Sequence, residues 1–197
     1  MEKYFLLYFT FYLISFYSTY YHLNYLNKHI EINEYDTLPD LLIESLPDLS
    51  NVKICNFMID SFILILFIPF FIKKRYDLLY FMFKIISILT LLRSVTKLVT
   101  IVPSQNNNCS NNSSIKTYLT GYCNDKIFSG HTAITLILIL TIMENKLINN
   151  NYNSLLVFSH IFYAFLILAT RNHYSVDVVL GYIITYSVFN NLKEVLI

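Results

Sequence analysis

Two histidines and one aspartate in the second half of the sequence have the types and spacing needed for phosphoryl-transfer chemistry. His173 and Asp177 lie four positions apart, which places them on one face of a helix and within mutual reach. A carboxylate that binds one imidazole nitrogen fixes the ring tautomer and frees the other nitrogen as a nucleophile. His131 follows Ser129 and Gly130, a pair typical of a helix start, where free N–H groups attract anions. These groups would suffice for in-line displacement at phosphorus, with His173 attacking and His131 protonating the leaving alkoxide.

Each of these signals also has a simpler structural explanation. His131 and Ser129 would equally serve as an interfacial histidine and a helix-capping serine. His173 and Asp177 would equally form an ordinary surface pair in the first turn of a helix, where the helix dipole favours an acid. The functional interpretation gains weight because these side chains border strongly apolar segments, where polar groups are expensive.

A pair of cations lies near the end of another apolar segment. Arg93 and Lys97 recur at helical spacing, and Arg93 lies ten residues before Pro103. A guanidinium at membrane depth needs a partner, and it can bind a phosphate through two parallel hydrogen bonds. We therefore predict both cations as phosphate-binding residues. The alternative is that Asp60, in a neighbouring apolar segment, simply pairs with one of them.

The composition indicates an integral membrane protein. The chain has 197 residues, of which 55% are hydrophobic and only 14% are charged, and its mean hydropathy is +0.50. A soluble domain of this length cannot hide so much apolar surface, and a disordered chain would be far less hydrophobic. The net charge of +1 gives no polycationic field, so we expect no nucleic-acid partner.

Six apolar segments are each long enough to cross a bilayer as a helix, which takes about 20 residues. Together they occupy most of the chain and leave no separate domain or linker. We therefore expect an all-α membrane protein, with six transmembrane helices in a single bundle that forms one domain over residues 1–197. The predicted spans are 4–25, 55–72, 78–103, 129–148, 154–170 and 174–192.

The charges of the loops predict the orientation of the bundle. Residues 73–75 are Lys-Lys-Arg and lie between the second and third spans, which is a cytoplasmic signal. The loops 26–54 and 104–128 would then lie on the external side, together with the candidate site. The second of these loops contains three glycosylation sequons, which agrees with an external location.

The sequence predicts neither a metal centre nor a cofactor. It contains no HExxH or paired CxxC spacing, and three cysteines are too few for a disulfide scaffold. Cys109 and Cys123 flank one polar stretch, and whether they form a disulfide is left open.

Four motifs together resemble the sphingomyelin synthase family, a branch of the lipid phosphate phosphatase superfamily. Their order and approximate spacing agree with that family over about residues 38–190. The four motifs together are specific evidence for this resemblance, whereas any one of them alone would be weak evidence. The motifs are Leu38-Pro39-Asp40, Arg93-x-x-Thr96-x-x-x-Thr100-x-x-Pro103, Asp125-x-x-x-Ser129-Gly130-His131-Thr132 and His173-Tyr174-Ser175-x-Asp177-Val178.

The resemblance implies an exoplasmic active site in a Golgi or plasma membrane, with both chain ends in the cytosol. It implies transfer of a phospho-head group from a glycerophospholipid to the primary hydroxyl of ceramide, with diacylglycerol as product. Phosphocholine is the first choice of head group, and phosphoethanolamine and phosphoinositol are the others. His173 would form a phosphohistidine-type intermediate, Asp177 would orient it, and His131 would act as acid and base. The residues expected to bind substrate or phosphate are Arg93, Lys97, Asp125, Ser129, Gly130 and Tyr174.

The sequence departs from the animal members of that family in ways that leave the head group open. Asn124 stands where those enzymes carry glycine, and Lys97 adds a charge where they are apolar. The oligomeric state is also left open, and a homo-oligomer is compatible with the sequence. The expected partners are therefore membrane lipids, namely ceramide and a glycerophospholipid.

Two other functions compete with the synthase. One is a lipid phosphatase or a phospholipase C-like hydrolase of the same superfamily. Lipid phosphate phosphatases carry a Lys-x6-Arg-Pro motif that this sequence lacks, and an arginine six residues before the nucleophilic histidine, where Ile167 stands here. The other is a non-catalytic lipid-binding membrane protein, which the retention of His131, His173 and Asp177 disfavours.

Overall fold

A computed structural model describes residues 5–29, 37–100, 102–105 and 127–196 of the chain. The secondary structure of the described residues is helical, without a strand, and each predicted span overlaps one long helix. The all-α prediction is therefore confirmed for this part of the chain. The long helices are α1 (Phe5–His29), α3 (Lys53–Ile72), α4 (Tyr76–Val99), α6 (Gly130–Glu144), α7 (Asn153–Ala169) and α8 (Ser175–Leu196), with two short ones, α2 (Leu41–Ser45) and η2 (Asn150–Tyr152).

Three segments are both long enough and apolar enough to cross a membrane. They are α3, most of α4, and η2 together with α7, over Lys53–Ile72, Tyr76–Thr96 and Asn150–Ala169. Two further apolar helical stretches are shorter, Phe5–Ser18 and Gly130–Glu144. Length and composition thus support three spans, and the crossing of all six helices stays a prediction.

The third predicted span ends earlier than the sequence suggests. α4 stops at Val99 instead of continuing to Pro103, and Thr100 already has an extended backbone. A residue that precedes proline is disfavoured in the helical conformation, so Val102 is not expected to be part of the helix. The Pro103 carbonyl accepts a hydrogen bond from the Tyr174 hydroxyl, next to the candidate site.

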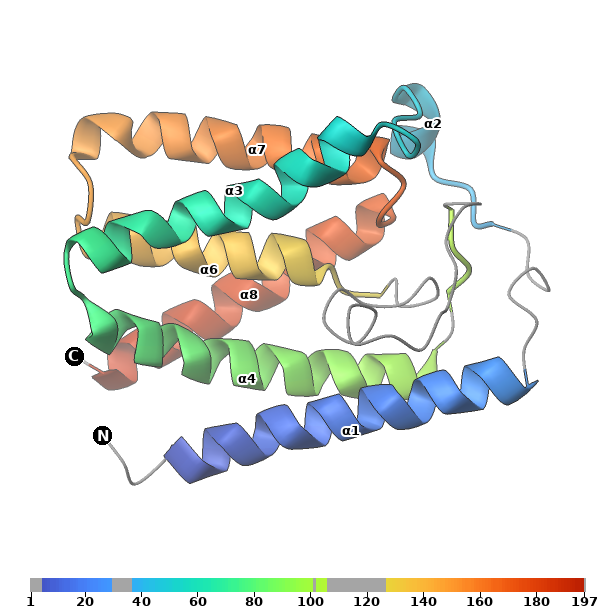
Figure 1. The fold of residues 1–197 in the computed structure, drawn as a ribbon, viewed down its shortest axis with the longest axis horizontal. Coiled ribbons are helices and arrows are strands. Elements are labelled where there is room, and N and C mark those ends of the chain that lie inside the picture. The colour runs from blue at the N-terminus through green and yellow to red at the C-terminus, as the bar shows by residue number, and fades with distance from the viewer. Residues whose placement is uncertain (1–4, 30–36, 101, 106–126, 197) are drawn as a thin grey trace.

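Helix α6 occupies the middle of the bundle and packs against α3, α4, α7 and α8 (Figure 1). Its buried face includes Ile137 and Ile142, which join Phe70 of α3, Ile85 of α4 and Phe189 of α8 in the main core. The turn that joins α3 to α4 lies at one end of the bundle with the end of α8, and α2 lies at the other end (Figure 1).

Helix α1 packs along α4 at the edge of the bundle (Figure 1). The ammonium of Lys84 lies over the rings of Tyr80 and Tyr8, 4.7 and 5.7 Å from their centroids, so its charge is partnered inside an apolar helix pair. The Ser94 hydroxyl donates to the Ser15 carbonyl at 3.4 Å across the same interface.

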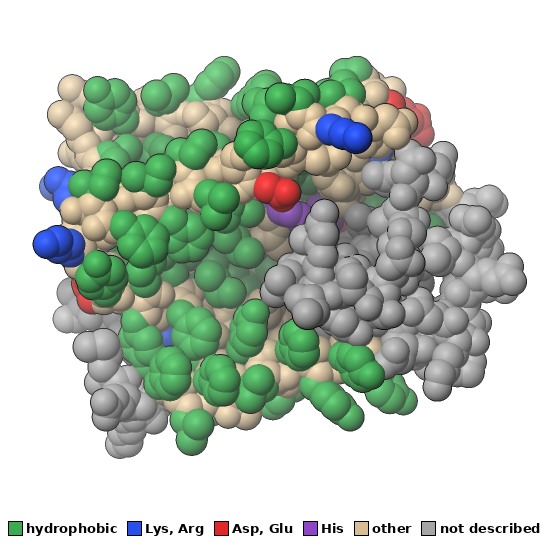
Figure 2. All heavy atoms as spheres, viewed as in Figure 1, with side chains coloured by type: hydrophobic (Ala, Val, Ile, Leu, Met, Phe, Trp, Pro, Cys, Tyr) green, Lys and Arg blue, Asp and Glu red, His purple; other side chains and the backbone are tan. Residues whose placement is uncertain are grey.

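Hydrophobic side chains cover the visible face of the bundle over α1, α3, α4 and α7 (Figure 2). Only 22% of the apolar window of α3 is buried inside the protein. An apolar surface of this extent requires a lipid environment, which agrees with the composition.

Helices α6 and α8 approach each other closely at Gly181. A Cβ atom at this position would lie 3.2 Å from the Ser129 carbonyl oxygen and 3.3 Å from the Thr132 Cβ. A side chain at this position would press against the first turn of α6, whereas glycine lets that turn lie directly on α8.

We predict that Gly181→Val lowers the free energy of unfolding by about 1–3 kcal/mol, because a branched side chain cannot fit against a backbone carbonyl. Thermal unfolding in detergent micelles would measure the change. Val179→Ile on the exposed face of α8 is the matched control and should leave stability unchanged. Equal stability of Gly181→Val and the wild type would contradict the close approach.

Candidate active site

His173 and Asp177 form a buried pair at the start of α8. The Nδ1 atom of His173 lies 3.5 Å from an Asp177 carboxylate oxygen, and both side chains are almost fully buried. The same oxygen accepts a 3.0 Å hydrogen bond from the Tyr174 backbone N–H. His173 precedes the helix and Asp177 lies in its first turn, so the pair spans the helix start. The predicted partnership of these two residues is therefore present, and Nε2 is the imidazole nitrogen that does not face Asp177.

His131 lies beside this pair. It is in the first turn of α6, and its ring centroid is 6.0 Å from that of His173, with the planes inclined by 65°. The Ser129 N–H donates to the Asp177 carbonyl oxygen at 3.2 Å, which ties the start of α6 to the first turn of α8. The structure thus brings together the three residues that the sequence predicts as catalytic.

Ser129 is the N-cap of α6. Its Oγ accepts hydrogen bonds from the Thr132 N–H at 3.2 Å and from the Thr132 hydroxyl at 3.0 Å, and the residue is fully buried. The sequence predicts Ser129 as a phosphate-binding residue, and this stays a prediction. In the structure its hydroxyl oxygen accepts both capping bonds and sets the position of the helix start.

Arg93 reaches the same helix start from α4. Its guanidinium lies so close to Gly130 that a Cβ atom there would collide with a guanidinium nitrogen. Glycine at the first position of α6 thus makes room for a cation immediately before His131. Arg93 and Asp60 form no ion pair, and Asp60 is exposed on α3, so the structure does not support the alternative that Asp60 neutralises Arg93.

Asp40 holds the turn that carries His173. One carboxylate oxygen accepts from the Ile43 N–H at 3.2 Å and caps α2, while the other accepts from the Ser175 N–H at 2.7 Å at the start of α8. Burial alone would raise the pKa of Asp40, but the hydrogen bonds from Ser175 and Ile43 outweigh it and hold the pKa below its ordinary value. The sequence points to this residue only through the Leu38-Pro39-Asp40 resemblance, since its two partners are far apart along the chain.

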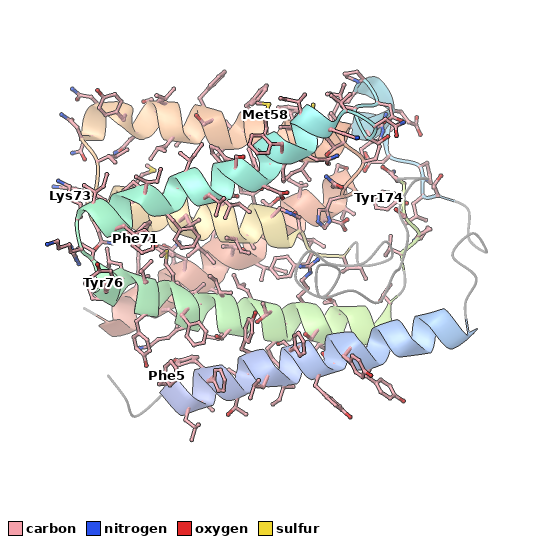
Figure 3. The ribbon with its side chains drawn as sticks, viewed as in Figure 1. Phe5, Met58, Phe71, Lys73, Tyr76 and Tyr174 are labelled. Atoms are coloured by element: carbon pink, nitrogen blue, oxygen red, sulfur yellow. The ribbon has the colours of Figure 1, made fainter. Side chains whose placement is uncertain are left out.

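Tyr174 ties three segments together beside His173 (Figure 3). Its hydroxyl donates to the Pro103 carbonyl at 3.1 Å and accepts from the Leu38 N–H at 3.2 Å. The sequence predicts Tyr174 as a phosphate-binding residue, whereas both of these hydrogen bonds lie within the protein and position the loops around the site.

Arg171 fixes the other end of α2. It follows α7 with a left-handed φ of 56°, and its guanidinium donates to the carbonyls of Ile43 and Leu46. A left-handed conformation is unfavourable for a residue other than glycine, and these hydrogen bonds hold it in place. Sequence reasoning gave Arg171 no part, because its partners lie far away along the chain.

The remaining predicted residues lie beyond what the structure describes. Asp125 and both cysteines of the 104–128 loop, Cys109 and Cys123, are outside the described residues, as are the three sequons. The backbone of Lys97 belongs to α4, but its side chain is outside the description too. Within the described residues, no group of three or more His, Cys, Asp or Glu side chains could hold a metal ion.

Comparison with known proteins gives one family match, in the second half of the chain. Residues 122–195 match the family model described as PAP2 superfamily C-terminal. This segment covers less than half of the chain and includes His131, His173 and Asp177. No curated protein matches the chain.

We predict that Asp40→Asn lowers the free energy of unfolding by about 1–2 kcal/mol, because an amide nitrogen cannot accept the second of the two N–H groups. Since the folded-state pKa of Asp40 is depressed, its contribution is complete above its ordinary value of 3.8 and is lost as the pH falls through the folded value. The difference between wild type and variant should therefore shrink on acidification. Thermal unfolding of both proteins at neutral and acidic pH measures this difference, with Glu44→Gln at an exposed position of α2 as the control. A difference independent of pH would contradict the assignment.

Proposed function

We propose that the chain is a sphingolipid synthase that transfers a phospho-head group from a glycerophospholipid to the primary hydroxyl of ceramide and releases diacylglycerol. The observation that carries this proposal is the buried His173–Asp177 pair with the His131 ring 6.0 Å away. The match to the PAP2 superfamily C-terminal model over 122–195 supports chemistry of the phosphatase or phosphotransferase type at these residues. The motif resemblance to the sphingomyelin synthase family supports the more specific reaction.

In the first half-reaction, Nε2 of His173 attacks the phosphorus of the donor lipid. A nitrogen–phosphorus bond forms, and the bond between phosphorus and the glycerol oxygen breaks. His131 gives its proton to that oxygen, which leaves as the hydroxyl of diacylglycerol. Asp177 holds the opposite nitrogen of His173 and stabilises the positive charge that develops on the ring.

In the second half-reaction, the ceramide hydroxyl oxygen attacks the same phosphorus. Its proton passes to His131, and the nitrogen–phosphorus bond breaks to regenerate His173. The two half-reactions are symmetric, so one acid/base residue serves both. Arg93, which lies against Gly130 at the start of α6, would stabilise the equatorial phosphate oxygens.

Hydrolysis is the second candidate function, and the PAP2 match favours it directly. Water could replace ceramide in the second half-reaction and release a free phospho-head group, as in a phospholipase C-like enzyme. The absent Lys-x6-Arg-Pro motif and Ile167 argue against a lipid phosphate phosphatase. The exoplasmic side and a Golgi or plasma membrane belong to the same proposal, as implied by the family resemblance.

We predict that a head-group transfer assay in proteoliposomes yields a new sphingolipid that depends on His173. Labelled ceramide would be supplied with phosphatidylcholine, phosphatidylethanolamine or phosphatidylinositol, one donor at a time. His173→Ala should lower the rate by about three orders of magnitude or more, because it removes the nucleophile. Size-exclusion chromatography of each variant would confirm folding.

The other outcomes of this assay separate the competing functions. Diacylglycerol release without a ceramide product would identify a phospholipase C-like enzyme. If no donor gives a product but phosphatidic acid releases phosphate, the protein is a phosphatase. If a folded protein gives no product with any of these lipids, the remaining function is that of a non-catalytic lipid-binding protein.

We further predict that Gly130→Ala raises the donor KM by roughly 10-fold, because the new methyl group displaces the Arg93 guanidinium and weakens one charge-assisted hydrogen bond. The fold should tolerate the change, since the displaced group is the end of a flexible side chain. A double-mutant cycle with Arg93→Ala tests this route. If the donor KM of the double variant is clearly higher than that of Arg93→Ala alone, Gly130 acts by a route that does not involve Arg93.

A further inference from the structure

The most exposed large hydrophobic side chain in the described chain lies outside all six long helices. Leu41, on the short helix α2, is 85% exposed, and Leu38 and Leu42 beside it are 50% and 41% exposed. Exposed leucines on a membrane span are covered by lipid acyl chains, but α2 belongs to no predicted span. We therefore expect another molecule to cover the apolar surface of α2.

Helix α2 cannot turn these leucines inward, because it is fixed at both ends. Asp40 joins its start to Ser175, and Arg171 holds the carbonyls of Ile43 and Leu46. Ile43 is 4% exposed and belongs to one buried cluster with Cys55 and Ile59 of α3. With Ile43 anchored inward, Leu41 on the opposite side of the helix is held outward.

The exposed apolar surface of α3 continues onto α2. Ile54, Phe57 and Met58 are 63%, 67% and 44% exposed at the end of α3 next to α2. Figure 3 shows Met58 toward this end of α3, and Figure 1 shows α2 directly beyond it. Exposed apolar side chains thus occur on both α3 and α2 at this end of the bundle, which points to lipid as the occupant of both.

The charges around α2 indicate the kind of lipid. Glu44 and Asp48 are exposed beside the leucines, whereas the exposed Lys53 lies at the start of α3 and the Arg171 guanidinium is engaged with the Ile43 and Leu46 carbonyls. Acidic side chains repel anionic lipid head groups, whereas polybasic segments bind them. A zwitterionic leaflet is therefore the favourable surface for this segment.

We propose that α2, with Leu38, Leu41 and Leu42, is an interfacial segment seated at the head-group boundary of a zwitterionic leaflet. Because Asp40 and Arg171 tie α2 to the turn that carries His173, the segment fixes the depth of the site relative to the lipid phosphates. The proposal concerns a contact with the membrane and does not depend on which reaction the site performs.

The absence of tryptophan from the sequence makes a direct test available. Leu41→Trp introduces the sole tryptophan of the chain at an exposed position, where folding should be unaffected, and it can be excited selectively over the tyrosines. The full-length variant would be reconstituted in phosphatidylcholine vesicles whose acyl chains are brominated near the head group. Phe57→Trp on the exposed face of α3 is the lipid-facing control, and Lys73→Trp in the turn between α3 and α4, outside the candidate spans, is the water-facing control.

We expect Leu41→Trp to have blue-shifted emission and to lose most of its fluorescence to the brominated lipid, as Phe57→Trp does, while Lys73→Trp stays red-shifted and unquenched. Replacement of part of the phosphatidylcholine by phosphatidylglycerol should leave quenching unchanged or reduce it. Red-shifted emission that aqueous iodide quenches would overturn the proposal. Blue-shifted emission that brominated lipid does not quench would also overturn it, because protein would then cover Leu41. Stronger quenching in anionic vesicles would refute the preference for a zwitterionic surface.

Discussion

The buried carboxylate of Asp177 is the constraint on which the site depends. A carboxylate removed from water is unfavourable unless it is hydrogen-bonded or paired. Asp177 meets this demand with the Tyr174 N–H and the His173 imidazole, so its burial fixes the ring that we propose as the nucleophile. Its backbone carbonyl meanwhile accepts from Ser129, which sets the start of α6 and with it His131. One residue therefore positions both histidines.

The same end of the bundle gathers segments that are distant along the chain. Asp40 and Arg171 hold α2 against the turn before α8, and Tyr174 joins the stretches around Leu38 and Pro103. None of these contacts involves the apolar faces of the long helices. The apolar helices give the bundle its scaffold, and a separate layer of hydrogen bonds to backbone groups gives the site its geometry. A substitution in that layer would therefore alter the site while leaving the helices in place.

Much of this arrangement could be predicted from the sequence. Runs of about 20 apolar residues locate the long helices, and the four-residue spacing of His173 and Asp177 identifies their pairing. Spacing could not reveal that the pair spans the helix start, because the last residues before a helix and its first turn look alike in sequence. The roles of Asp40, Arg171 and the Tyr174 hydroxyl depend on contacts between distant segments, for which a single sequence carries no local pattern.

Two helix starts and one guanidinium converge where the histidines meet. α6 begins at Gly130 beside Arg93, and α8 begins two residues after His173. Both helix dipoles direct their positive ends toward this point, which favours an anion there. A single histidine could be accommodated as a packing residue, as His160 is between the rings of Tyr163 and Tyr182. Two adjacent histidines, a cation and two positive helix ends could all contact one phosphate group, which is the group that the proposed reaction transfers.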